Sequence, residues 1–151
     1  MPLKPRQINR FTLFKLPSAY FCGVRVKSIS EVKCVTSVKY KWINQNPFRS
    51  MFWAVQGMAA ELSTGALVMS CIRDSNRTIS MLVVNNSATF LKKATGRINF
   101  TCEDGLLIKQ AIKKTIETRE GQTCRMKAKG LNSEGITVSV FEFEWTIKMK
   151  N

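Results

Sequence analysis

The chain has 151 residues, 44% of them hydrophobic and 23% charged, which is enough to bury the core of one domain without disulfide bonds. Its 24 Lys and Arg against 10 Asp and Glu give a formal charge of +14, so we expect either an anionic partner or simply a basic surface. The absence of histidine excludes the commonest general base, the Ser-His and Cys-His nucleophile pairs and most zinc sites.

The five cysteines are odd in number and include no CxxC pair, so neither a disulfide framework nor a zinc ribbon is indicated. Reduced thiols favour a cytoplasmic protein, and we expect no metal and no cofactor. The basic residues are dispersed along the chain, so we do not expect a dedicated nucleic-acid surface.

Residues 1–19 form an N-terminal extension that is basic and interrupted by Lys15 and Pro17. Its apolar run is too short for a signal peptide. We therefore predict a partly helical extension, with a short helix near residues 7–16.

Two half-buried strands are predicted next, because apolar and polar residues alternate over residues 22–28 and 32–40. Cys22 belongs to the apolar face of the first strand and Ser37 to the polar face of the second. Four of the five cysteines fall on apolar strand faces of this kind, where a free cysteine behaves as a small hydrophobic core residue.

Residues 51–72, MFWAVQGMAAELSTGALVMSCI, contain a single formal charge, Glu61, at their centre. The segment has the length of a membrane span. A carboxylate at its midpoint opposes insertion, as do Gln56 and several Ser, Thr and Gly residues. We expect no membrane span and instead a long helix in the protein core.

The remaining segments alternate mostly as strands. Residues 79–91 are apolar on both faces in their first half, which predicts a covered central strand. Helical spacing returns over residues 105–119, an amphipathic helix preceded by acidic residues. Three further strands are predicted at residues 97–102, 124–129 and 141–149. A turn is predicted at residues 132–135, before the last strand.

A long apolar helix needs apolar surface all round it, and a curved antiparallel sheet wrapped around that helix supplies it. The expected fold is thus α+β, one domain over residues 1–151, with one extra amphipathic helix between the later strands.

Two motifs accompany this order of elements. Asn46-Pro47 is followed by Phe52-Trp53-Ala54 and then by Glu61, nine positions after Phe52; later comes FLKKATG at residues 90–96. Over residues 20–149 the chain resembles hotdog-fold acyl-CoA thioesterases, specifically the phenylacetate-pathway type and an uncharacterised thioesterase-like bacterial branch. In that motif an asparagine, a short loop and His-Gly-Gly precede an acidic residue nine positions after the histidine. Phe52-Trp53-Ala54 stands where His-Gly-Gly would be.

The resemblance implies hydrolysis of a thioester. Glu61 would activate water or attack the carbonyl, Asn46 would position the water, and backbone N–H groups of Trp53 and Ala54 would stabilise the oxyanion. The resemblance also implies that the protein assembles as a homodimer or a dimer of dimers. Its expected ligand is acyl-CoA or a similar anionic small molecule. Further residues expected at the site are Phe52, Gly57 and Gly65 in the substrate pocket and Lys92 and Lys93 at the CoA phosphates.

Other interpretations of these residues stay open. Glu61 could be a buried ion-pair partner, and Asn46 could be a turn residue. Gly57 and Gly65 lie on the same helix stripe as Glu61, where they could admit a ligand or another chain. Trp42, Phe52 and Trp53 could line an acyl pocket or fill the core, and Lys92 and Lys93 could simply be solvated. The protein itself could be a binding module that has lost turnover together with His-Gly-Gly.

Overall fold

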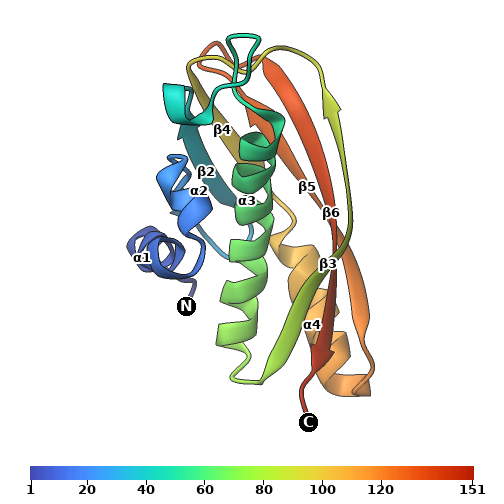
Figure 1. Cartoon of the computed structure of the whole chain (residues 1–151). Helices are drawn as coiled ribbons and strands as arrows, with labels where there is room; N and C mark the ends of the chain where they lie inside the picture. The colour runs from blue at the N-terminus through green and yellow to red at the C-terminus, as the bar shows by residue number, and fades with distance from the viewer.

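The computed structural model describes residues 1–151 as one mixed helix and strand domain (Figure 1). In chain order its elements are α1 (Pro5–Lys15), α2 (Pro17–Phe21), β1 (Arg25–Ile29), β2 (Cys34–Lys39), the short 3-10 helix η1 (Trp42–Asn44), α3 (Trp53–Asp74), β3 (Ile79–Phe90), β4 (Arg97–Cys102), α4 (Gly105–Thr118), β5 (Gln122–Leu131) and β6 (Thr137–Met149).

Six antiparallel strands form one sheet in the order β1-β2-β4-β5-β6-β3, and this sheet curves around α3 (Figure 1). The expected hotdog fold is therefore confirmed. By length and composition α3 could cross a membrane, but 67% of its most apolar window is buried inside the protein. The sheet supplies the apolar surface that this helix needs, so α3 is the core helix of the domain.

The inner face of β6 is the main wall of the core. Phe141, Phe143, Trp145 and Ile147 are all buried, as the alternation predicts, and the rings of Phe141 and Phe143 stack with centroids 6.0 Å apart. The predicted turn joins β5 to β6, where Gly135 has a φ of 77°. Aromatic side chains from one long strand thus fix the distance between the sheet and α3.

The N-terminal extension is helical, as predicted, and comprises two helices. The side chain of Asn9 in α1 bonds both backbone groups of Val26 in β1, accepting from N–H at 2.8 Å and donating to C=O at 3.0 Å. Ile8 and Thr12 are the buried residues of α1. These contacts dock α1 alongside the first strand.

Three details of the predicted strands are wrong. β3 is an edge strand that pairs only with β6, and its Leu82 and Val84 are exposed, because no strand of the same chain covers its outer side. Ser37 is buried, since the guanidinium of Arg97 covers it and donates to its hydroxyl at 2.9 Å. Cys22 is half-buried at the end of α2, because the chain turns at Gly23, with a φ of 95°, before β1 begins.

The predicted amphipathic helix α4 separates β4 from most of β5. These strands pair only where Asn99–Thr101 meets Lys129–Leu131, and α4 packs against β5 and β6 beyond that point. The start of α4 rests on the turn between β1 and β2, where the N–H of Gly105 donates to the carbonyl of Val32 at 3.1 Å. A side chain at position 105 would overlap the carbonyl oxygen of Glu31.

Candidate functional site

Glu61 lies near the middle of α3, is exposed to solvent, and borders a cavity of about 320 Å³. The cavity is bounded by α3, by the junction of α1 with α2, and by the facing parts of β3 and β6. Its apolar lining comes chiefly from Met58, Leu62, Met69, Met81 and Trp145. A single carboxylate therefore faces a pocket of thioether and indole groups.

The carboxylate of Glu61 has no ionic partner in the chain. All seven ion pairs involve other acidic groups, and Lys15, which lines the same cavity, is not paired with it. Partial burial against the apolar walls raises the pKa of Glu61 above the ordinary glutamate value. The ion-pair role left open by the sequence is not seen within one chain, and the cavity favours the neutral, protonated acid more than water would.

Gly65 and Gly57 allow aromatic residues of β6 to approach α3. A Cβ at position 65 would lie 3.2 Å from Cζ2 of Trp145, and one at position 57 would lie 3.5 Å from Cε1 of Phe141. Gly65 lines the Glu61 cavity, whereas Gly57 does not. The space directly beside each glycine is thus partly filled by an aromatic ring of β6, and only Gly65 also borders the Glu61 cavity.

The start of α3 forms a second hollow, a groove of about 630 Å³. It brings together most of the other predicted site residues, namely Asn46, Phe52, Trp53, Lys92 and Lys93. Phe52 caps the helix without a side-chain hydrogen bond, and the N–H groups of Trp53 and Ala54 find no acceptor in the chain. Two free amides at the positive end of a helix dipole suit an oxyanion.

Asn46 organises the loop ahead of α3. Its Oδ1 accepts from the N–H groups of Phe48 at 2.9 Å and Ser50 at 3.2 Å, and its Nδ2 donates to Ser50 Oγ at 2.9 Å. Asn46 therefore acts as a turn residue here, with both Oδ1 and Nδ2 hydrogen-bonded within the loop. Lys93 also holds this loop, donating from Nζ to the carbonyl of Phe48 at 3.2 Å, whereas Lys92 is simply exposed.

A buried polar pair behind the groove was not singled out by the sequence. The hydroxyl of Ser139 in β6 donates to Oε1 of Gln56 at 2.8 Å, and Nε2 of Gln56 donates to the carbonyl of Met51 at 3.3 Å. Both side chains are buried. An amide in an otherwise apolar helix was the available signal, since such a group needs partners inside the core.

The Glu61 cavity and the groove do not meet in one chain. Eight residues separate Trp53 from Glu61, which is about 12 Å along an α-helix. A single carbonyl group cannot contact both the free amides and the carboxylate of the same molecule. The structure thus gathers Asn46, Phe52, Trp53, Ala54, Lys92 and Lys93 at one end of α3 and leaves Glu61 in a separate cavity.

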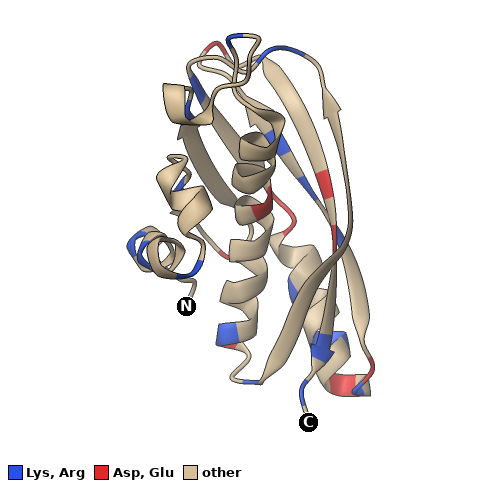
Figure 2. Cartoon of the chain, viewed as in Figure 1, with Lys and Arg blue, Asp and Glu red and all other residues tan.

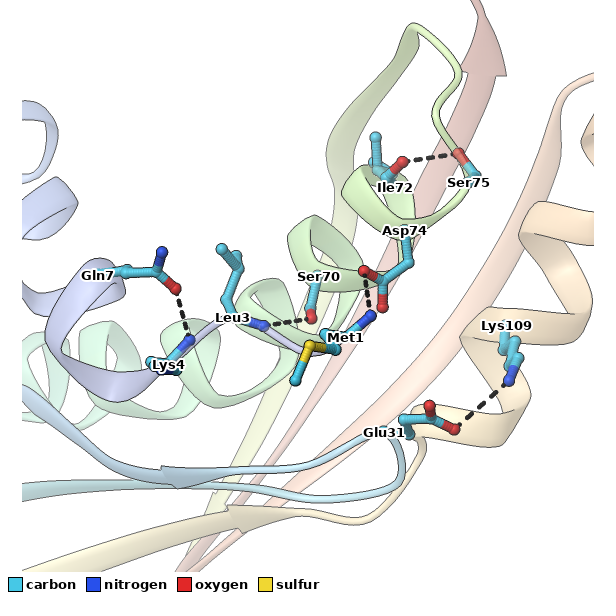
Figure 3. Close-up of polar contacts among 10 residues, drawn as sticks. All are labelled: Met1, Leu3, Lys4, Gln7, Glu31, Ser70, Ile72, Asp74, Ser75 and Lys109. Carbon is cyan, nitrogen blue, oxygen red and sulfur yellow. Dashed lines mark hydrogen bonds and ion pairs between the residues drawn. The ribbon is translucent and has the colours of Figure 1, made fainter.

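A third cavity, of about 510 Å³, lies between the C-terminal half of α3 and α4 (Figure 3). Its charged groups are largely matched to one another. Lys109 pairs with Glu31 at 3.5 Å, and the amino group of Met1 pairs with Asp74 at 3.0 Å. None of the predicted site residues lines it. Nor does the chain gather three or more Cys, Asp or Glu side chains where they could hold a metal ion.

A family model described as a domain of unknown function (DUF4442) matches residues 5–147. The chain belongs to the DUF4442 family. No curated protein matches the sequence of this DUF4442 chain.

Solved structures similar to this DUF4442 chain share its architecture over nearly its whole length. A Pseudomonas aeruginosa protein described as a probable thioesterase has a TM-score of 0.83 at 20% identity, with 99% of each chain covered. A Chlorobaculum tepidum protein of unknown function has a TM-score of 0.83 at 17% identity and 98% coverage of each chain. A thioesterase from Haemophilus influenzae has a TM-score of 0.74 at 9% identity, covering 99% of this chain and 93% of its own.

These similarities establish the fold of the DUF4442 chain. The resemblance to hotdog proteins drawn from the residues is confirmed at that level, because thioesterases and this chain wrap the same sheet around the same central helix. Function must be argued from the site, since one fold supports many activities.

Proposed function

We propose that this protein is a thioesterase-type hydrolase that cleaves an acyl-CoA or a similar anionic thioester, with Glu61 as the catalytic carboxylate. The observation that carries the proposal is the unpaired carboxylate of Glu61 on a cavity lined by methionine and tryptophan. An acyl chain fits such a lining, and a carboxylate with a raised pKa is a stronger base than one in water.

The reaction assigns one role to each group. Glu61 takes a proton from a water molecule as the water oxygen attacks the thioester carbonyl. The N–H groups of Trp53 and Ala54 stabilise the oxyanion that forms. Collapse of the intermediate breaks the carbon–sulfur bond, and the leaving thiolate takes the proton from Glu61, which yields a carboxylic acid and a thiol.

About 12 Å separates the free amides from Glu61 along one α3 helix. The proposal therefore needs a second copy of the chain, whose free amides would lie beside the Glu61 of the first. The edge strand β3 supports such an assembly. Its sequence, ISMLVVNNSATF, contains no charged residue or proline that would block edge pairing. Exposed Leu82, Val84 and Phe90 lie along the same strand. We therefore include a homodimer, or a dimer of dimers, in the proposal.

The carrier half of the substrate would lie at the basic groove. Lys92 and Lys93 border the free amides of α3, and their charges suit CoA phosphates or another anionic carrier. Asn46 contributes by shaping the loop that leads into α3.

Five free cysteines fit a cytoplasmic location, which we include in the proposal.

The test is thiol release from a panel of acyl-CoAs by wild type, Glu61→Gln and a control, Glu134→Gln, which removes an unpaired surface carboxylate from the β5–β6 turn. We expect Glu61→Gln to lose at least about 100-fold in kcat/KM, the usual contribution of a general base, and the control to match wild type. Turnover that survives Glu61→Gln would show that another group is the base.

A second candidate function is ligand binding without turnover. Exposed Phe52 and Trp53, with ring centroids 5.9 Å apart, cover the start of α3, where the related motif has a histidine followed by a glycine. If wild type releases no thiol while acyl-CoA raises its Tm, the binding function replaces the enzymatic one.

A further inference from the structure

The N-terminal elements expose six apolar side chains that the core does not use. We call this surface the N-terminal face and define it by Phe11, Phe14, Leu16, Phe21, Trp42 and Ile43. Trp42 is 83% exposed, Phe14 69% and Phe21 65%. Trp42 was expected in the core or in an acyl pocket, yet it is neither buried nor part of the Glu61 cavity or the groove. Exposed patches of this kind usually mark an interaction site.

The elements that carry this face are joined to one another. Figure 1 shows α1 and α2 stacked on the same side of α3, and Leu16 is the residue that links them. The side chain of Asn44 in η1 donates to the carbonyl of Cys22 at the end of α2, at 2.9 Å, which places Trp42 and Ile43 next to α2. The six apolar side chains are therefore carried by elements that adjoin one another.

The same layer is basic and carries no acidic residue. Residues 1–30 contain six Lys and Arg and no Asp or Glu, and Lys41 adjoins Trp42 in sequence. Figure 2 shows blue and no red on the two N-terminal helices. None of these basic side chains takes part in an ion pair. On α1, Arg6, Arg10 and Phe14 follow one another at four-residue spacing on the exposed side. Cations without an ionic partner and an exposed phenylalanine thus lie on the same outer surface of α1.

We propose that the N-terminal face docks this protein onto an anionic phospholipid bilayer. Phenylalanine and tryptophan side chains partition into the boundary between headgroups and acyl chains, while Lys and Arg are attracted to anionic headgroups. A second copy on this face would bring like charges together, which disfavours self-association there. A purely electrostatic partner, such as nucleic acid, would leave the apolar groups without a role.

The docked face would adjoin the Glu61 cavity, because Lys15 and Leu16 also line that cavity. Docking would present the cavity to the layer in which acyl chains are found. The inference goes beyond the proposed function and does not depend on it, since lipid binding is measured without turnover.

The experiment is co-sedimentation of the full chain with vesicles of phosphatidylcholine, alone or mixed with phosphatidylglycerol, at low and high salt. We expect binding only to the mixed vesicles, weakening as salt rises, with a blue shift of tryptophan fluorescence. Phe14→Ser with Trp42→Ser should weaken binding by about tenfold or more, because both side chains lose their place in the interface. Arg6→Glu with Arg10→Glu should weaken it similarly.

The matched control is Lys114→Glu with Lys129→Glu, which reverses two exposed, unpaired charges on α4 and β5. It should bind nearly as well as wild type. The proposal is overturned if wild type ignores anionic vesicles, or if the control loses as much binding as Arg6→Glu with Arg10→Glu. It is also overturned if the aromatic variant, shown folded by circular dichroism, binds as tightly as wild type, since the attraction would then be electrostatic only. If light scattering shows that the aromatic variant dissociates an oligomer, the face is an interface between copies and the proposal fails.

Discussion

The indole Nε1 of Trp145 donates a hydrogen bond of 2.9 Å to the hydroxyl of Thr64, in the middle of the core helix. The same hydroxyl donates to the backbone carbonyl of Glu61 at 2.8 Å. One threonine thereby connects the last strand to the turn of α3 that carries the candidate carboxylate. It also holds the indole in place as a wall of the Glu61 cavity.

Replacing Thr64 by valine should destabilise the protein by about 1–3 kcal/mol, because the buried N–H of Trp145 loses its acceptor while the shape is kept. Thr64→Ser is the control, since it retains the hydroxyl. Urea unfolding measures both variants. Equal stability of the valine and serine variants would mean that the hydrogen bond contributes nothing measurable.

The two glycines that face β6 should respond differently to alanine. Gly57→Ala places its Cβ at ordinary contact distance from Phe141, so we expect up to about 1 kcal/mol of stabilisation from the better helix propensity. Gly65→Ala should gain clearly less or lose stability, because its Cβ would lie 3.2 Å from the Trp145 ring. Chemical denaturation of the pair decides, and a larger gain at position 65 would contradict the packing described.

Gly105→Ala should be severely destabilising, by more than about 3 kcal/mol, because the new Cβ would overlap the backbone of Glu31 and Val32. Ala111→Gly, elsewhere in α4, is a useful comparison and should cost only about 1 kcal/mol through helix propensity. The comparison uses the free energy of unfolding or, if Gly105→Ala does not fold, the yield of soluble protein. A Gly105→Ala variant as stable as Ala111→Gly would show that the start of α4 can move away from the turn.

Glu61 should lower the stability of the protein as the pH rises. Its folded-state pKa is raised above the ordinary 4.5, so the unfolded chain releases the proton first and is favoured increasingly above that pH, up to the folded-state pKa. Glu61→Gln removes this loss. We expect its Tm to exceed that of wild type at neutral pH, with the difference disappearing toward about pH 4. Glu134→Gln should show no such trend, and a pH-independent difference for Glu61→Gln would argue against titration of this carboxylate.

The five thiols should separate into two classes. Burial raises the pKa of Cys34 and Cys102 to about 12 and that of Cys124 to about 11, which suppresses the reactive thiolate. Cys22 and Cys71 are half-buried. In the native protein we expect a thiol reagent to modify these two first and the other three only on unfolding. Mass spectrometry of the labelled protein identifies the order, and early labelling of Cys34 would show that β2 opens readily.

Local pattern was sufficient for most of the fold. The strict alternation of β6 and the helical spacing of α4 are confirmed because each has one clearly buried face. The edge position of β3 could not be predicted from its own residues. A strand that is apolar on both faces can lie in the middle of a sheet or at its edge, and its own sequence does not distinguish the two positions.

The candidate site was only partly accessible from the sequence. The sequence placed Trp53 and Glu61 on one helix. The rise of that helix keeps them about 12 Å apart, so the predicted site residues divide between the groove at the start of α3 and the Glu61 cavity. The roles of Gly57 and Gly65 depended on which residues face them, and Phe141 and Trp145 lie about eighty positions away in the chain. Long-range packing of this kind leaves no local signature.

β4 and β5 are joined only by a short junction. Three residues of β4, Asn99–Thr101, hold the layer of β1, β2 and β4 to the layer of β5, β6 and β3, and α4 occupies the rest of the boundary. β4 and β5 pair over fewer residues than any other two neighbouring strands, so we expect the sheet to open first at this seam. Trp145 and Met81 belong to one layer, whereas the α1–α2 junction packs against the other. Opening at this seam would therefore widen the Glu61 cavity.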